Sequence, residues 1–123
     1  MENDTKIKRL ETPEDHDYPA AASYLSLLYE SADVNDYVHR LKQVPISLFK
    51  SKDIFRTSGL SPLGISNSRA KKDHKKISSG QPPSPLLLVR DAAHGKVIIA
   101  DGYHRLCAVY ATDEDAVVPC KIV

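Results

Sequence analysis

Four residue types are scarce in this 123-residue sequence, which has two cysteines, one methionine, two phenylalanines and no tryptophan. Cys107 and Cys120 match none of the spacings of zinc sites. We therefore expect two free, buried small side chains rather than metal ligands or a redox pair. The acidic N-terminus does not look like an export signal, which favours the reducing cytoplasm.

Long apolar runs and an excess of either charge are also lacking. No apolar segment approaches the length of a membrane span, so we expect no membrane partner. Seventeen basic side chains against sixteen acidic ones leave a formal charge of +1, which gives little long-range attraction toward nucleic acid. The length and the hydrophobic fraction of 41% predict one globular domain.

The N-terminal third divides into a tail and a helical hairpin. Residues 1–17 are charged and poor in apolar side chains, and we interpret them as a flexible tail. Residues 18–44 predict two helices, with Pro19 in the first turn of one and Asp33 as the N-cap of the other. Their predicted apolar faces consist of Ala22, Leu25, Leu28 and Tyr29, and of Val34, Tyr37, Val38 and Leu41. We expect the hairpin to cover a sheet, or to bind a second copy or another protein.

Residues 45–123 predict the core of an α/β (α+β) domain in which helices pack on a small mixed sheet. Pro45 ends the helical hairpin, a strand can begin at Ile46, and a short helix from about Ser51 stops at Gly59. A further helix is expected over 69–77. Strands at 86–90 and 97–100 then form a β-hairpin, with His94 at its tip and without a partner.

The last part of the chain predicts a strand, a tight turn, a helix and a final strand. The turn is Asp101-Gly102, and the helix runs from Tyr103 to Thr112, before three acidic residues that would be unfavourable at its C-terminus. A solvated loop is the default for these acids, although they could recruit a divalent cation. Residues 117–123 form the final strand, and Pro119 predicts a sheet edge or a bulge for it.

The strand–turn–helix segment KVIIADGYHRLCAVYA (96–111) carries the clearest functional signal. The N-terminus of a helix presents unpaired N–H groups and the positive end of the helix dipole, which together attract anions. His104 and Arg105 lie in the first turn and would add two cationic donors. Asp101, in the turn before the helix, can serve as its N-cap.

Two further groups of cations could contact a phosphate. Lys52 and Arg56 lie one turn apart on a predicted helix, a spacing that can clamp a phosphate but more commonly forms a solvated face. Arg69 and Lys72 belong to the most basic run of the chain, which ends at Lys76. That run could contact nucleic-acid phosphates, but no aromatic side chain is interleaved for base stacking, so a nucleic-acid partner is not expected.

Three features of the chain belong together: the order of elements from residue 69, the DGYHRLCA segment at the strand–helix junction, and the closing V-P-x-K-I-V. In these features the chain resembles the ParB N-terminal-domain and sulfiredoxin-like superfamily. The resemblance covers residues 43–123 and includes uncharacterised bacterial proteins and archaeal free-serine kinases with an Asp-Gly-His-His-Arg type of motif. It implies that Gly102, His104 and Arg105 hold the phosphates of a nucleotide such as ATP, with Mg²⁺. It further implies that Asp101 faces the same pocket, where it would brace His104 or Arg105, bind Mg²⁺ or act as a base, and these alternatives and the N-cap stay open. It also implies a cation on the preceding helix, at Arg69 or Lys72.

Departures from the family pattern narrow the expected activity. Tyr103 stands where sulfiredoxins have their nucleophilic cysteine, so sulfinic acid reduction is not expected. No helix-turn-helix follows the motif, which argues against the sequence-specific DNA binding of ParB proteins.

Three functions remain open. One is nucleotide-dependent phosphoryl transfer or hydrolysis, with Asp101 and His104 as catalytic residues and the cations stabilising charge. Another is a nucleotide-sensing or partner-binding module without catalysis. The weakest is nonspecific DNA contact or nuclease activity.

Overall fold

The computed structural model describes residues 12–62, 68–78 and 84–123. Most of the predicted tail, residues 1–11, lies outside them. The helices are α1 (Asp17–Leu25), α2 (Ser31–Gln43), α3 (Ser51–Ser58), α4 (Ser68–Ser78) and α5 (Tyr103–Thr112), with one 3₁₀ turn, η1 (Ala92–His94). The strands are β1 (Ser47–Lys50), β2 (Leu86–Asp91), β3 (Lys96–Asp101) and β4 (Val117–Ile122). The predicted helices and strands are therefore present, most of them within two residues of their expected bounds.

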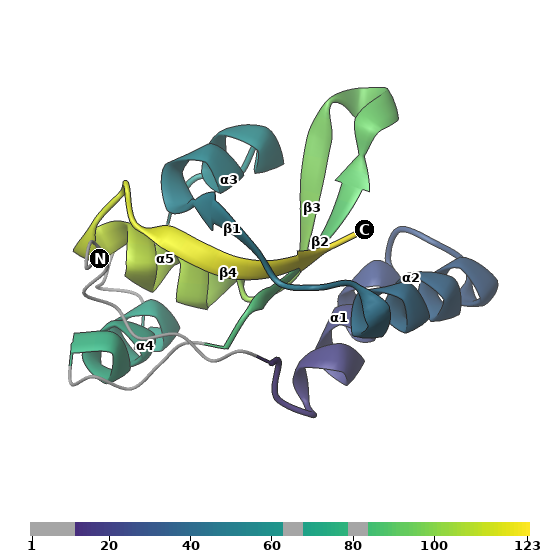
Figure 1. The fold of residues 1–123 in the computed structure, drawn as a ribbon, viewed down its shortest axis with the longest axis horizontal. Helices are drawn as coiled ribbons and strands as arrows, with labels where there is room; N and C mark the ends of the chain where they lie inside the picture. The colour runs from purple at the N-terminus through teal and green to yellow at the C-terminus, as the bar shows by residue number, and fades with distance from the viewer. Residues whose placement is uncertain (1–11, 63–67, 79–83) are drawn as a thin grey trace.

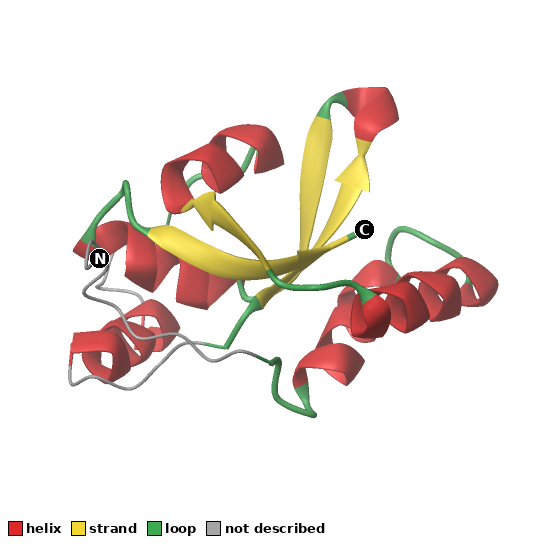
Figure 2. Cartoon of the chain, in the orientation of Figure 1, coloured by secondary structure: helices red, strands yellow, loops and turns green. Residues whose placement is uncertain are grey.

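The four strands form one mixed sheet in the order β1-β4-β2-β3. β4 is antiparallel to β1 and parallel to β2, whereas β2 and β3 form the predicted antiparallel hairpin. Figure 2 shows the hairpin extending beyond the helices at one end of the sheet. Helices and a small mixed sheet confirm the predicted α+β class.

The position of β4 corrects the sequence prediction. Pro119 led us to expect an edge strand or a bulge, yet β4 lies between β1 and β2. The pairing register explains how the strand tolerates proline. Pro119 opposes Leu48 of β1, but pairing with β2 begins only at Cys120. At Pro119, therefore, β4 has a neighbouring strand on one side alone, and the missing N–H interrupts no ladder with β2.

The strand β2 is buried on both faces of the sheet, whereas the edge strand β1 is largely exposed. Leu86 and Leu88 point into a cluster with α3, α4 and α5, whereas Leu87 and Val89 point into a second cluster with α1 and α2. A strand that is buried on both faces has a continuous apolar sequence rather than an alternating one, and the LLLV segment of β2 (86–89) has such a sequence. In Figure 1, α1 and α2 lie together, apart from α4 and α5.

The predicted N-terminal helical hairpin is present, with three corrections. Its second helix begins at Ser31 rather than after Asp33, and Leu28 of the predicted apolar face is 52% exposed. The tail also ends earlier than predicted, because Asp17 is the first residue of α1 and its side chain is only 1% exposed. Its carboxylate accepts a hydrogen bond from the backbone N–H of Glu14 at 2.9 Å.

The tip of the β2–β3 hairpin differs from the prediction in one contact. Nδ1 of His94 lies 2.9 Å from a carboxylate oxygen of Asp91, so this histidine has a partner. Gly95 follows with a φ of 65°, in the left-handed region that favours glycine. Within the described part of the chain, no helix is long and apolar enough to cross a membrane.

Candidate functional site

The junction between β3 and α5 depends on a glycine. Gly102 has a φ of 107°, and a Cβ at this position would overlap Cδ2 of Leu86. The carbonyl of Gly102 accepts the first hydrogen bond of α5, from Leu106 N–H at 2.9 Å. A glycine has no side chain with which to cap the helix, and the N-terminus of a helix attracts anions through its backbone N–H groups and its dipole.

This helix N-terminus opens into a pocket of about 620 Å³. Its walls come from α1, from the end of β3, from the first turn of α5, from α4 and from the chain after α3. The lining residues are Ala20, Tyr24, Leu60, Asp73, Ile99, Ala100, Asp101, Gly102, Tyr103, His104 and Arg105. The DGYHR segment, which the sequence singled out, therefore lines one wall of the pocket.

Arg105 is held by acceptors of the protein itself. Its Nη2 donates to Oδ2 of Asp101 at 3.0 Å and to the carbonyl of Pro85 at 3.3 Å. Its Nη1 lies 3.8 Å from Oδ1 of Asp17. The side chain of Arg105 is 20% exposed, so these contacts are shielded from water. Of the roles open to Asp101, the structure shows the brace to Arg105, and no local pattern in the sequence indicates that Asp17 also contacts this arginine.

Burial raises the pKa of the Asp101 carboxyl, and the nearby charge of Asp17 adds to this effect. The guanidinium of Arg105 acts in the opposite direction, but the loss of hydration outweighs it. Asp101 is 14% exposed. The folded protein therefore holds a proton on Asp101 more tightly than an unfolded chain does.

Tyr103 and His104 lie side by side at the pocket wall. The hydroxyl of Tyr103 donates to the carbonyl of Ser61, which ties α5 to the chain after α3. Its ring packs edge-on against Phe55, with centroids 6.3 Å apart, and burial raises the pKa of its phenol. The ring of His104 meets that of Tyr103 at 5.4 Å and an angle of 70°.

Of the other predicted cations, Lys52, Arg56 and Lys72 do not line this pocket. Lys52 pairs with Asp115 at 2.7 Å, and Arg56 lies 4.0 Å from Asp53 on its own helix. Lys72 is exposed on α4 and lines no part of the pocket, to which α4 contributes the acidic Asp73 instead. The side chain of Arg69 lies outside what the structure describes.

Acidic Asp73, together with Tyr24 and Ala20, was not among the predicted site residues. These side chains come from helices that are distant in the sequence. No local pattern in α1 or α4 indicates that they face the DGYHR turn.

A magnesium ion at Asp101 does not fit the arrangement. The two carboxylates that approach each other, Asp17 and Asp101, already share the guanidinium of Arg105 as their cation. The acids at 113–115 do not form a centre either, since no group of three or more His, Cys, Asp or Glu among the described residues is placed to hold a metal ion.

Neither cysteine forms a disulfide and both are buried, as the sequence predicts. Desolvation raises the pKa of Cys120 to about 12, so its thiol stays protonated and unreactive at neutral pH. Cys107 is fully buried in α5, one turn after Tyr103.

Comparison of the chain with models of known protein families, with curated protein sequences and with solved structures finds no match. The resemblance to the ParB and sulfiredoxin-like superfamily therefore stays a prediction, and the geometry at Gly102 carries the functional argument.

Proposed function

We propose that this protein binds a phosphate-bearing small molecule, with a nucleotide as the expected ligand, in the pocket at Gly102. The observation that carries the proposal is the glycine-capped N-terminus of α5, which faces an open space of about 620 Å³. That volume lies within the range of about 300–1,000 Å³ found for small-molecule sites. Backbone N–H groups at a helix start are a common phosphate site in proteins.

In this proposal, different side chains of the pocket contact different parts of the ligand. His104 lies in the first turn of α5, where its ring can donate to a phosphate oxygen beside the backbone N–H groups. The rings of Tyr24 and Tyr103 offer flat apolar surfaces for the remainder of the ligand. Arg105 stabilises the turn rather than contacting the ligand, because its charge is already shared with Asp17 and Asp101.

This arrangement favours binding without catalysis over phosphoryl transfer. A transferase needs cations that stabilise the charge developing on the phosphoryl group. Here the guanidinium of the site is paired with two carboxylates, and Lys52, Arg56 and Lys72 do not line the pocket. An enzyme acting through Asp101 and His104 is the second candidate, supported by the raised pKa of the Asp101 carboxyl within the pocket.

Thermal unfolding with ATP, ADP, CTP and inorganic phosphate, with and without Mg²⁺, tests the proposal. A ligand at a hundred times its Kd stabilises the folded state by about 2.7 kcal/mol. We expect His104→Ala to reduce the stabilisation, whereas His39→Ala, which changes an exposed histidine on α2, leaves it unchanged. The proposal fails if neither phosphate nor any nucleotide raises the unfolding temperature.

The same samples separate the two candidates. Release of phosphate or transfer of a phosphoryl group from a bound nucleotide would identify an enzyme, and Asp101→Asn should then abolish turnover while binding persists. Binding without turnover by the wild-type protein identifies a binding module.

A further inference from the structure

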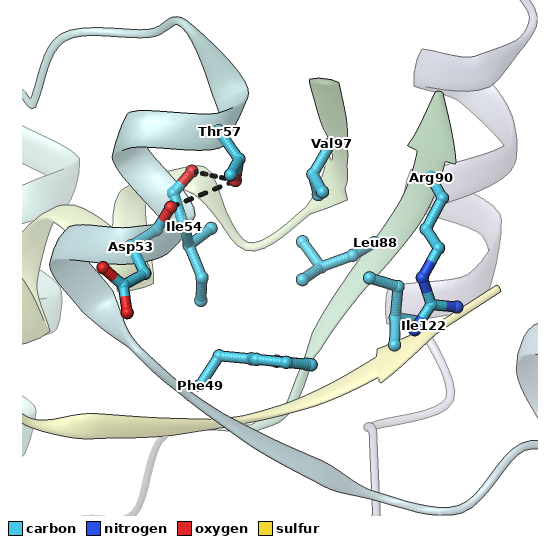
Figure 3. Close-up of a pocket in the computed structure, with 8 residues that line it drawn as sticks. All are labelled: Phe49, Asp53, Ile54, Thr57, Leu88, Arg90, Val97 and Ile122. Carbon is cyan, nitrogen blue, oxygen red and sulfur yellow. Dashed lines mark hydrogen bonds between the residues drawn. The ribbon is translucent and has the colours of Figure 1, made fainter. Parts of the chain in front are cut away.

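A second pocket, of about 210 Å³, lies between α3 and the sheet and shares no lining residue with the pocket at Gly102. Figure 3 shows its side chains: Phe49, Leu88 and Val97 surround the middle of the space, and the guanidinium of Arg90 lies beside Ile122 at one side. The remaining lining residues come from α3 and are Asp53, Ile54 and Thr57.

The strand pattern explains why an arginine borders this apolar space. Leu86, Leu88 and Arg90 alternate along β2 and therefore face the same side of the sheet. The first two are buried, and Arg90 continues the row where it leaves the core. Val97 is the register partner of Arg90 on β3, and Ile122 is the partner of Leu88 on β4. The floor of the pocket is thus an apolar row that ends in one guanidinium.

The charges at the two sides of the pocket are not equivalent. Asp53 has a cationic neighbour, Arg56, at 4.0 Å. Arg90, in contrast, has no hydrogen-bonded or ionic side-chain partner among the residues described. An anionic group could therefore pair with Arg90 without displacing any contact, whereas a cationic group at Asp53 would compete with Arg56.

We propose that this pocket binds a small amphipathic monocarboxylate, with an aromatic ring or a short aliphatic chain between α3 and the sheet and its carboxylate on Arg90. The volume suits such a ligand, because an apolar cavity of about 150 Å³ holds one benzene molecule. The remaining space accommodates a carboxylate or a short chain. Arginine is suited to the contact, since its guanidinium can form paired hydrogen bonds with both carboxylate oxygens.

Methyl NMR spectra recorded with benzoate, phenylacetate and hexanoate test the location. We expect these ligands, at low millimolar concentrations, to shift the methyl resonances of Leu88, Val97 and Ile122. The methyl resonances of Leu25 and Leu41, which belong to the cluster on the opposite face of the sheet, serve as internal controls and should not move. Absence of shifts at Leu88, Val97 and Ile122 overturns the proposal.

The charge of the ligand is tested with matched analogues. Benzoate should bind more tightly than benzamide, and Arg90→Gln should weaken benzoate by about two- to fivefold, which is within the range expected of an exposed ion pair, without affecting benzamide. Arg40→Gln is the control, because Arg40 is an exposed arginine of α2 that pairs with Asp36. Equal effects of Arg90→Gln on benzoate and benzamide, or tighter binding of benzylamine than of benzoate, would overturn the assignment of a carboxylate.

Discussion

A methyl group at position 102 would overlap the side chain of Leu86 and would lie 2.9 Å from Nη2 of Arg105. The backbone at this residue also has a φ of 107°, which side chains rarely adopt. Gly95 also has a positive φ, 65°, but nothing lies within 4 Å of the position that a Cβ would occupy there. Comparing substitutions at the two glycines therefore separates the free-energy cost of the backbone conformation from the free-energy cost of a steric clash.

We expect Gly102→Ala to lower the free energy of unfolding by about 2–5 kcal/mol, the sum of left-handed strain and overpacking against Leu86. Gly95→Ala carries the strain alone and should cost about 1–2 kcal/mol. Urea denaturation of both variants measures the difference. Equal losses would mean that the close packing of Gly102 against Leu86 contributes nothing to stability.

Replacing Arg105 should make stability depend more strongly on pH. Arg105→Met removes the guanidinium that Asp101 and Asp17 share, so we expect a loss of about 3–5 kcal/mol at neutral pH. The pKa of Asp101, already raised by burial, rises further in the variant. A raised folded-state pKa stabilises the protein at pH values below about 3.9, the ordinary value for aspartate, and this stabilisation is lost as the pH rises through the folded-state pKa.

The loss in Arg105→Met should therefore be smaller at pH 4 than at pH 7, as measured by urea denaturation at both values. Arg40→Met, which breaks an exposed pair with Asp36, is the control and should show no such trend. A loss in Arg105→Met that is the same at both pH values would contradict the buried pairing with Asp101.

The sequence identified the DGYHR turn because its signal is local: a glycine between an apolar strand and an amphipathic helix. The partners of the turn are not local. Asp17 lies in a charged stretch whose composition predicts a tail, and nothing in that stretch indicates a contact with Arg105. The same holds for Asp73, which lies in a run of lysines but faces the pocket.

At the scale of helices and strands, the predicted helix boundaries that are marked by a glycine are confirmed. Gly59 ends α3 with a φ of 72°, and α5 spans Tyr103–Thr112 as expected. The place of a strand in the sheet is a different matter, because it depends on which distant strands pair with it. Pro119 favours an edge on statistical grounds, but pairing with β2 begins beyond it, and that register cannot be read from β4 alone.

One contact between elements gives a prediction about α2. Lys121 of β4 is 9% exposed, and its Nζ donates to the carbonyl of Lys42 in the last turn of α2 at 3.1 Å. A cation at a helix C-terminus stabilises both the unpaired carbonyl and the helix dipole. Lys121→Met keeps the apolar stem and should cost about 1–2 kcal/mol in urea denaturation.

Amide hydrogen exchange locates the effect of Lys121→Met. Faster exchange should appear in the last turn of α2, around Leu41 and Gln43, and not in α3. Lys96→Met, an exposed lysine at the start of β3, is the control and should change neither stability nor exchange in α2. Unchanged exchange in α2 would show that Lys121 does not support that helix.

At the scale of the whole molecule, the two clusters on the two faces of the sheet share the strand β2. Leu87 belongs to the cluster with α1 and α2, and Leu88 to the cluster with α3, α4 and α5. Both leucines are at most 1% exposed. Because adjacent residues of one strand support both clusters, residues 18–123 are expected to unfold as one cooperative unit.

Leu87→Ala and Leu88→Ala should each lower the free energy of unfolding by about 2–5 kcal/mol. Each should also leave a single transition that has the same midpoint by tyrosine fluorescence and by circular dichroism. Leu27→Ala, on a residue that is 79% exposed, is the control and should have little effect. Separate transitions in Leu87→Ala would mean that the N-terminal hairpin is an independent unit.

The central place of β4 has a consequence for the order in which the sheet assembles. Within the described chain, β1 pairs with β4 and with no other strand, yet the two are separated in the sequence by every other strand and by three helices. Among the described strands β1 is synthesised first and β4 after the others, so β1 has no strand partner until Val117–Ile122 have been made. The strand pairing with the largest separation in the sequence therefore closes the sheet, and the β2–β3 hairpin is the part of it that can form beforehand.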